Sequence, residues 1–372
     1  MHRNTNFAIL GGGCAGLSFA AHLLQEGLND KHITIIEPRK SYFRDRTWCY
    51  WKVSDHLFSS CVSHRWPKMK MCTESDAIIR ELGQYPFEYI KADDYYNAAI
   101  ALLKQHDNVD LLLETHPLSV QEESDRIIIE TNQGTINADY LFDSRPPNLD
   151  EELVGRNDYL LQCFIGWGVR TENPIFDPTL FTLLELDTTV KNPVFAYYIL
   201  PTSEYEAVIC PIYFFKENCR YPDEIYEQRI KDYLLKHHAG TYQVTHKEKA
   251  ILPMMVFEGN RMHPTPRTYK LGTAAGLSRA ITSALFLNIQ RYNLELARLI
   301  IHDDFVTTPA AFSKQAYFTD GLFLKRLHQN PESYADIEMK FIRNTPIDTA
   351  IRYMEDCMNK TDFSVLLNAF NK

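Results

Sequence analysis

Residues 11–16 read Gly-Gly-Gly-Cys-Ala-Gly and fit the spacing G-x-G-x-x-G. The apolar run Phe7–Leu10 precedes them, and Leu17–Leu28 follows with helical spacing. Such glycines permit a tight turn and let backbone N–H groups at a helix N-terminus approach a pyrophosphate. Glu37 ends the next apolar strand, 21 positions after the last glycine, where an acid accepts hydrogen bonds from ribose hydroxyls. The stretch therefore predicts a dinucleotide-binding βαβ unit, for either NAD or FAD.

Two later features favour FAD over NAD. Asp143 ends a second apolar strand, and Gly272–Gly276 precedes a long helix predicted over residues 282–302. In glutathione-reductase-like flavoproteins, a late strand–glycine–helix junction approaches the flavin, and the positive helix end favours negative charge on the reduced ring. Each feature alone fits an ordinary turn or helix start. Their order along the chain makes FAD the predicted cofactor.

The succession of predicted elements indicates an α/β fold. A βαβ start is interrupted by antiparallel strands before the glycine-rich junction returns. We expect a discontinuous Rossmann-type FAD domain, resembling that of glutathione reductase, from residues 1–150 and 265–308, with substrate-side elements at 41–90. A mixed or antiparallel substrate sheet is expected in residues 151–264, and a helical part in 309–372.

Composition excludes several classes of protein. The 372 residues carry a net charge of −9 and no basic stripe, which disfavours nucleic-acid binding. Eight cysteines are scattered without a CxxC pair, so we expect reduced thiols, no metal site and a cytoplasmic protein. Apart from the glycine-interrupted N-terminal run, no apolar stretch reaches about 18 residues, so no membrane span is expected.

The aromatic-rich segment 41–72, which we expect to be irregular, contains the most specific motif. Asp45–Trp51 reads D-R-T-W-C-Y-W, close to the D-R-T-W-C-F-W of the flavin-containing lycopene cyclases, especially the bacterial β-cyclase branch. Further stretches resemble that family over nearly the whole chain, namely Asp143–Pro146, Phe164–Trp167, Gly272–Gly276, Asp320–Leu324 and Ile351–Met354.

This resemblance implies a para-hydroxybenzoate-hydroxylase-like fold and an FAD that must be reduced without net redox change, with NAD(P)H as the expected external reductant. It implies acid-initiated cyclisation of an apolar, carotenoid-type polyene. Arg46 would contact the flavin or its phosphates, or else pair with Asp45. The predicted cofactor contacts are Gly11, Gly13, Cys14, Ala15, Gly16, Glu37, Arg46, Thr47, Asp143, Gly272 and Gly276.

The chain departs from the family at two places. Cys210–Tyr213 replaces a Glu-centred motif regarded as the catalytic acid, and Ala280–Ala284 replaces P-S-T-G-Y. Asp187 matches a hydrophobic-Asp motif of the family, and Glu185 shares one strand face with it. Two carboxylates on one face raise one pKa, so these residues are the predicted replacement acids, with a solvated strand edge as the alternative.

The missing glutamate keeps a second function open. An FAD-dependent monooxygenase or oxidase acting on a hydrophobic natural product would use the same scaffold, and an inactive flavin-binding protein is a third interpretation. A polyene would come from a bilayer, so we expect peripheral contact with the inner face of the membrane. The helices after residue 309 are the candidates, with Phe312, Tyr317, Phe318, Leu322, Phe323 and Leu324.

Overall fold

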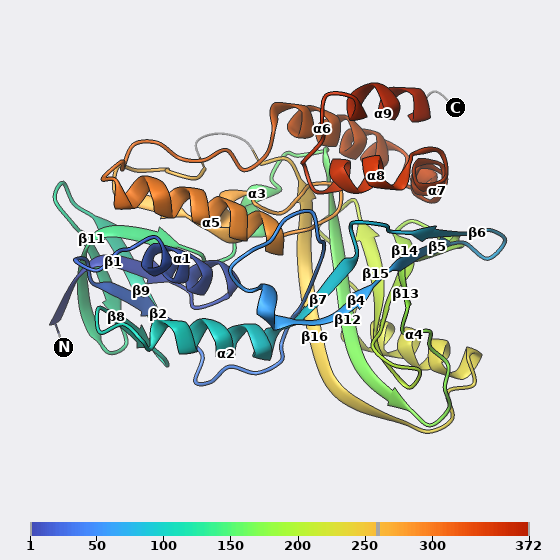
Figure 1. The fold of residues 1–372 in the computed structure, drawn as a ribbon, viewed down its shortest axis with the longest axis horizontal. Coiled ribbons are helices and arrows are strands. Elements are labelled where there is room, and N and C mark those ends of the chain that lie inside the picture. Colours follow the sequence, from blue (N-terminus) through green and yellow to red (C-terminus); the bar gives the residue numbers. More distant parts are fainter. Residues whose placement is uncertain (1, 258–260, 371–372) are drawn as a thin grey trace.

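The first sheet is built around strand β1 (His2–Leu10). The computed structural model describes residues 2–257 and 261–370, and Figure 1 shows this sheet at the N-terminal end of the molecule. Its strand order is β8-β2-β1-β11-β10-β9, with β17 pairing beside β11, and the strands β8, β2, β1, β11 and β17 run parallel. The other strands are β2 (Ile33–Ile36), β8 (Val109–Leu112), β9 (Pro117–Glu122), β10 (Ile127–Thr131), β11 (Gly134–Asp143) and β17 (Thr268–Lys270).

Three helices pack together on this sheet. They are α1 (Cys14–Gln25), α2 (Ala92–Leu103) and α5 (Phe286–Ile301). Leu17, Phe19 and Leu296 are fully buried in the core they share with β1 and β2. Strand β17 follows β11 by more than a hundred residues in the sequence and pairs with it in parallel. This pairing brings the late glycine-rich junction, which follows β17, close to the first glycine-rich turn.

The second sheet has the order β16-β12-β15-β14-β13-β5-β6 and is antiparallel except where β13 meets β5. Helix α4 (Asp223–Lys236) packs on one face, and the C-terminal helices pack on the other (Figure 1). The strands are β5 (Lys68–Cys72), β6 (Ala77–Glu81), β12 (Tyr159–Thr171), β13 (Leu180–Lys191), β14 (Val194–Pro201), β15 (Glu206–Phe215) and β16 (Tyr242–Met255). The C-terminal helices are α6 (Lys314–Gln329), α7 (Tyr334–Asn344), α8 (Ile347–Met354) and α9 (Asp362–Phe370).

A three-stranded antiparallel sheet lies between the two larger ones. It consists of β3 (Thr47–Trp51), β7 (Phe87–Lys91) and β4 (Val62–Trp66). Short helices α3 (Leu149–Glu152), η1 (Ser59–Cys61), η2 (Gly272–Ala275) and η3 (Pro331–Ser333) occupy the connections.

The predicted fold class is confirmed, with two local corrections. Residues 41–72 are not irregular, because β3, β4 and β5 lie there and pair with partners distant in the sequence. The helix expected over 282–302 begins only at Phe286, since residues 278–285 form a separate loop in which Ser283 has a φ of +56°.

Candidate active site

The glycine-rich turn joins β1 to α1 in a conformation that only small residues permit. Gly11 has a φ of +94°, and a Cβ on Gly16 would lie 2.0 Å from the carbonyl oxygen of Gly11. Helix α1 begins after Gly13 with no capping side chain and no acidic residue in its first turn. Its first N–H groups therefore remain available for an anion, as a pyrophosphate site requires.

Glu37 lies directly after β2 and is almost fully buried. Its carboxylate accepts hydrogen bonds from the Gly12 N–H at 2.7 Å, and from the Arg39 N–H and Nε at 2.8 and 3.0 Å. Arg39 in turn donates to the Tyr96 hydroxyl. These contacts fix the acid beside the turn, where a ribose would lie.

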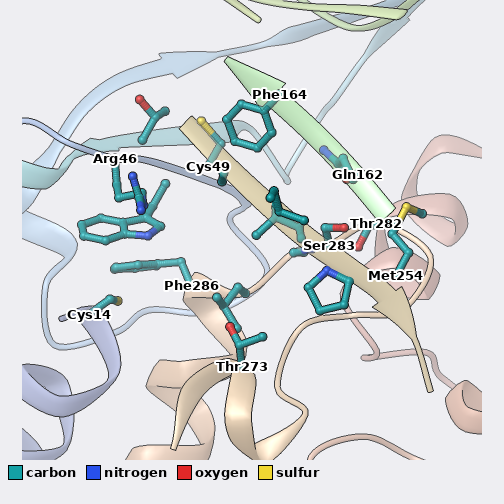
Figure 2. A pocket seen from close by; sticks show the side chains of 18 of the residues that line it. Cys14, Arg46, Cys49, Gln162, Phe164, Met254, Thr273, Thr282, Ser283 and Phe286 are labelled. Carbon is teal, nitrogen blue, oxygen red and sulfur yellow. Dashed lines mark hydrogen bonds between the residues drawn. The ribbon is translucent and has the colours of Figure 1, made fainter. Parts of the chain in front are cut away.

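A cavity of about 950 Å³ extends from this turn across the second sheet to the C-terminal helices. Figure 2 shows Cys14, Cys49, Met254 and Phe286, from four different elements, arranged around it. Most of the predicted cofactor contacts line the cavity: Gly11, Gly13, Cys14, Ala15, Glu37, Arg46, Thr47 and Gly272. The structure thus joins the early and late glycine-rich segments in one site.

Three predicted cofactor contacts lie outside the cavity lining. Gly16 provides the close approach of α1 to β1, and Gly276 ends η2 with a φ of +77° beside Phe257. Asp143 is buried, but its carboxylate accepts hydrogen bonds from Arg145 at 2.8 Å and Lys270 at 2.6 Å. Burial opposes the effect, yet these two cations lower its pKa. These residues support the turn rather than face the cavity.

Arg46 lines the cavity and donates a hydrogen bond to the Asp45 carbonyl oxygen at 2.7 Å. The backbone of Asp45, rather than its carboxylate, is therefore the partner of the guanidinium. This contact uses one terminal nitrogen, and the side chain retains further donors for a ligand.

The predicted acids Asp187 and Glu185 do not line the cavity. Glu185 pairs with Lys236 of α4 at 3.4 Å, and Asp187 lies 4.0 Å from Arg229 of the same helix. Burial raises the pKa of Asp187, but hydrogen bonds from Thr189 outweigh that effect and the pKa is lowered. The pKa of Asp187 is thus lowered rather than raised, and both carboxylates pair with helix α4 instead of lining the cavity.

A different carboxyl group, Glu248 of β16, lies in the cavity wall. It is opposite Gly166 of β12, and Cys210 of β15 approaches from the other side. The Cys210 thiol donates to the Glu248 Oε1 at 3.6 Å. A Cβ on Gly166 would lie 2.6 Å from that sulfur and 2.9 Å from the carboxylate, so the contact requires glycine. Glu248 therefore lies beside Cys210, the position at which the Glu-centred motif of the family begins.

Burial shifts the pKa of Glu248. It raises the pKa of the carboxyl group, while the hydrogen bond from Cys210 and the charges of Arg46 and Arg44 oppose the shift. A raised pKa is what a carboxylic acid needs in order to donate a proton. Sequence reasoning missed this residue, because only the strand pairing brings Glu248 to Cys210.

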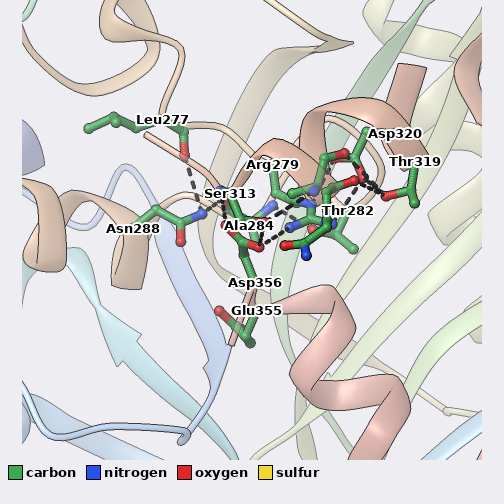
Figure 3. A network of polar contacts seen from close by, with 12 residues as sticks. Leu277, Arg279, Thr282, Ala284, Asn288, Ser313, Thr319, Asp320, Glu355 and Asp356 are labelled. Atoms are coloured by element: carbon green, nitrogen blue, oxygen red, sulfur yellow. Dashed lines mark hydrogen bonds and ion pairs between the residues drawn. The ribbon is translucent and has the colours of Figure 1, made fainter. Parts of the chain in front are cut away.

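The loop 278–285 closes the cavity beside the late glycine junction. Figure 3 shows how Arg279 anchors it. The fully buried guanidinium donates a hydrogen bond to Asp320 Oδ1 at 2.9 Å, and its Nε lies 2.8 Å from Asp320 Oδ2 in an ion pair. Its Nη1 lies 3.6 Å from Asp356. Ser283, held in the left-handed region, lines the cavity, and its hydroxyl has no hydrogen-bond partner among the described residues. The loop thus places a buried, unpartnered hydroxyl in the cavity wall.

The sequence comparison decides the family. Residues 6–305 match the model of the lycopene cyclase protein family. The chain belongs to this family. Its flavin-type glycine turn, its cavity and the D-R-T-W-C-Y-W motif at 45–51 are therefore those of a lycopene cyclase family member. No curated protein sequence is recognisably similar to the chain.

Solved structures share the fold of this lycopene cyclase family member at low sequence identity. A geranylgeranyl bacteriochlorophyll reductase-like protein from Thermoplasma acidophilum superposes with a TM-score of 0.65 at 14% identity, covering 100% of this chain and 97% of that one. A flavoprotein/dehydrogenase from Cytophaga hutchinsonii gives 0.63 at 10% identity, over 99% and 96%. A probable FAD-dependent monooxygenase from Pseudomonas aeruginosa gives 0.56 at 11% identity, over 100% of both chains. The architecture is that of flavoproteins.

Proposed function

We propose that the protein is an FAD-dependent enzyme that closes a ring on an apolar polyene, with Glu248 as the proton donor and without net redox change. The observation that carries this proposal is a buried glutamate of raised pKa in the wall of the cavity that begins at the glycine-rich turn. The family assignment makes a carotenoid-type substrate the first candidate.

The residues around the turn fit FAD. The uncapped N-terminus of α1 would hold the pyrophosphate, Glu37 the ribose hydroxyls, and Gly272 with Thr273 would lie under the flavin side of the cofactor. When bound in its reduced form, FAD would supply negative charge near a developing cation. NAD(P)H is the expected source of the electrons.

The chain's own groups perform the proton transfers. Glu248 donates its proton to one carbon of a terminal double bond, and the cation that forms closes the ring by reaction with a second double bond. Trp48, Phe164 and Phe286 line the cavity and stabilise positive charge through their π faces. The Glu248 carboxylate, which keeps its hydrogen bond from the Cys210 thiol, then accepts the proton that leaves the ring. The product is an isomer of the substrate.

Anaerobic turnover with photoreduced FAD and lycopene in liposomes tests this function. We expect a product of unchanged mass and blue-shifted absorbance, formed without stoichiometric reductant. Product carrying added oxygen, with coupled consumption of NAD(P)H and oxygen, would instead establish the monooxygenase alternative. Reducible bound flavin with no conversion under either condition would contradict both.

Substrate delivery points to a membrane contact at helix α6. No helix in the described part of the chain is long and apolar enough to cross a bilayer. Of the candidate side chains, Phe312 and Leu324 are buried, whereas Phe318 and Leu322 are 66% and 56% exposed one helical turn apart. The adjacent Phe323 lines the cavity, so α6 separates an exposed apolar face from the proposed substrate site. We propose that this face rests on the bilayer.

We expect Phe318→Ser combined with Leu322→Ser to weaken binding to anionic liposomes by about tenfold or more, since burial of each side chain contributes about 1.5–3 kcal/mol. A sedimentation assay measures the bound fraction. Ile225→Ser is the matched control, because Ile225 is an exposed apolar residue on helix α4. Unchanged sedimentation of the double variant would contradict the docking face.

A further inference from the structure

The cavity contains a second polar position, away from Glu248. On β15, the side chains of Cys210, Ile212 and Phe214 lie on one face and all line the cavity. Phe214 lies four residues from Cys210, or about 14 Å along the strand at about 3.4 Å per residue. The Phe214 end of the cavity is therefore well separated from the proposed proton donor.

Gln162 lies at the Phe214 end. It pairs with Phe214 across β12 and β15, and with Leu252 of β16, so its side chain shares their face. Figure 2 shows Gln162 at the cavity, on the strand that also carries Phe164. Its side-chain amide forms no hydrogen bond with any residue in the ranges the structure describes.

Glu338 approaches the same end from helix α7. Tyr334 of this helix stacks on Phe214 with ring centroids 4.8 Å apart, and Glu338 follows Tyr334 by one helical turn. The Glu338 carboxyl group lines the cavity and has no hydrogen-bond or ion-pair partner within the described parts of the chain.

Burial dominates the environment of Glu338. The side chain lines the cavity with part of its surface, and burial raises its pKa to about 7. A buried polar group without a partner costs free energy. An unpartnered carboxyl and an unpartnered amide, both lining the cavity beside the stacked Phe214 and Tyr334, therefore indicate a ligand group that satisfies both.

We propose that Gln162 and Glu338 form a subsite for a hydroxyl group on an otherwise apolar isoprenoid chain. This subsite rests on the proposed function, because it assumes that the reacting double bond of the same chain lies beside Glu248. A hydroxyl group complements the pair, because it donates to the carboxyl oxygen and accepts from the amide nitrogen. The substrate class that follows includes hydroxylated isoprenoids beside the hydrocarbon polyenes.

Binding measurements on the flavin-loaded protein test the subsite independently of turnover. The probes are geraniol, farnesol and geranylgeraniol, each compared with its methyl ether by isothermal titration calorimetry in detergent. The ether keeps the chain but cannot donate a hydrogen bond. For the best-fitting chain length, we expect the alcohol to bind wild type about tenfold more tightly than the ether, the effect of one hydrogen bond to a carboxyl group.

The variants are Glu338→Leu and Gln162→Leu, with Asp336→Asn as the control because Asp336 is exposed on the same helix. We expect the preference to fall to about one in Glu338→Leu, to shrink in Gln162→Leu and to persist in the control. Glu338→Leu removes a buried unpaired carboxyl group and should melt at a higher temperature. If it does not fold, Gln162→Leu alone decides the result.

Equal binding of alcohol and ether to wild type would overturn the subsite, and so would a preference that survives both variants. Failure of the proposed function has a different signature. An alcohol preference that depends on Glu338, in a protein that converts no polyene, would retain the subsite and reject the cyclase chemistry. A protein that cyclises a hydrocarbon but binds alcohol and ether equally would retain the cyclase chemistry and reject the subsite.

Discussion

Glu248→Gln is expected to lower the rate of polyene cyclisation by about 10²- to 10⁴-fold, the usual contribution of a positioned general acid. Glutamine keeps the shape of the side chain beside Cys210 and Gly166 but cannot donate the required proton. Flavin binding should be unchanged, since the glycine-rich turn is intact. Single-turnover conversion of lycopene with photoreduced flavin, followed by product absorbance, measures the rate.

The same substitution has a signature in stability. The pKa of Glu248 is raised in the folded state, so the folded protein binds more protons than the unfolded chain between the ordinary and the raised pKa. Stability from this group is present at low pH and is lost as pH rises through the raised value. Glu248→Gln should flatten that part of the pH profile measured by urea unfolding.

Matched controls distinguish Glu248 from the carboxylates that the sequence favoured. Asp187→Asn and Glu185→Gln should retain at least about half of the wild-type rate, because both residues face helix α4 and lie outside the cavity lining. A Glu248→Gln enzyme that cyclises as fast as these controls would show that the proton comes from elsewhere.

The fold was predictable because its signals are local. The glycine spacing at 11–16, the acid at Glu37 and the apolar strands before them are all readable within forty residues, and the structure joins them as expected. The strands at 47–72 were not predictable. β3 and β4 pair with β7, and β5 lies between its neighbour β6 and the distant β13, a pairing that spans more than a hundred residues. Strand propensity in such segments depends on those distant partners.

The acid was missed for the same reason. Glu248 lies between Lys247 and Lys249, in a run that resembles a solvated strand, and both lysines do pair with residues of helix α4. The opposite face of the strand points into the cavity, where Gly166 leaves room for the carboxylate. Asp187 matched a family motif, but a motif match gives no information about which sheet face is covered by a helix.

The loop 278–285 shows what replaced the family's P-S-T-G-Y segment. Arg279 is fully buried between α6 and the end of α8, and its guanidinium lies 5.4 Å from the Tyr353 ring centroid. Asp356, which Arg279 faces, also accepts hydrogen bonds from the Ser313 N–H and hydroxyl at 2.7 and 2.6 Å. One buried cation therefore ties the cavity loop to two separate parts of the C-terminal helices, as Figure 3 shows.

We expect Arg279→Met to destabilise the protein by about 3–5 kcal/mol, the cost of removing one partner from a buried ion pair. Burial raises the pKa of Asp320 to about 6, against the opposing charge of Arg279. Without that charge the carboxylate would be buried and uncompensated. Urea unfolding at neutral pH measures the loss, and flavin affinity should fall with it, because the loop carrying Ser283 loses its anchor.

The double variant Arg279→Met with Asp320→Asn separates the charge effect from packing. Removing both charges abolishes the uncompensated carboxylate, so we expect it to regain at least about half of the lost free energy of unfolding. Exposed ion pairs contribute only about 0–1 kcal/mol, so a loss in that range for Arg279→Met would show that water enters the network. A double variant less stable than Arg279→Met would mean instead that the guanidinium acts by packing against Phe312 and Tyr353.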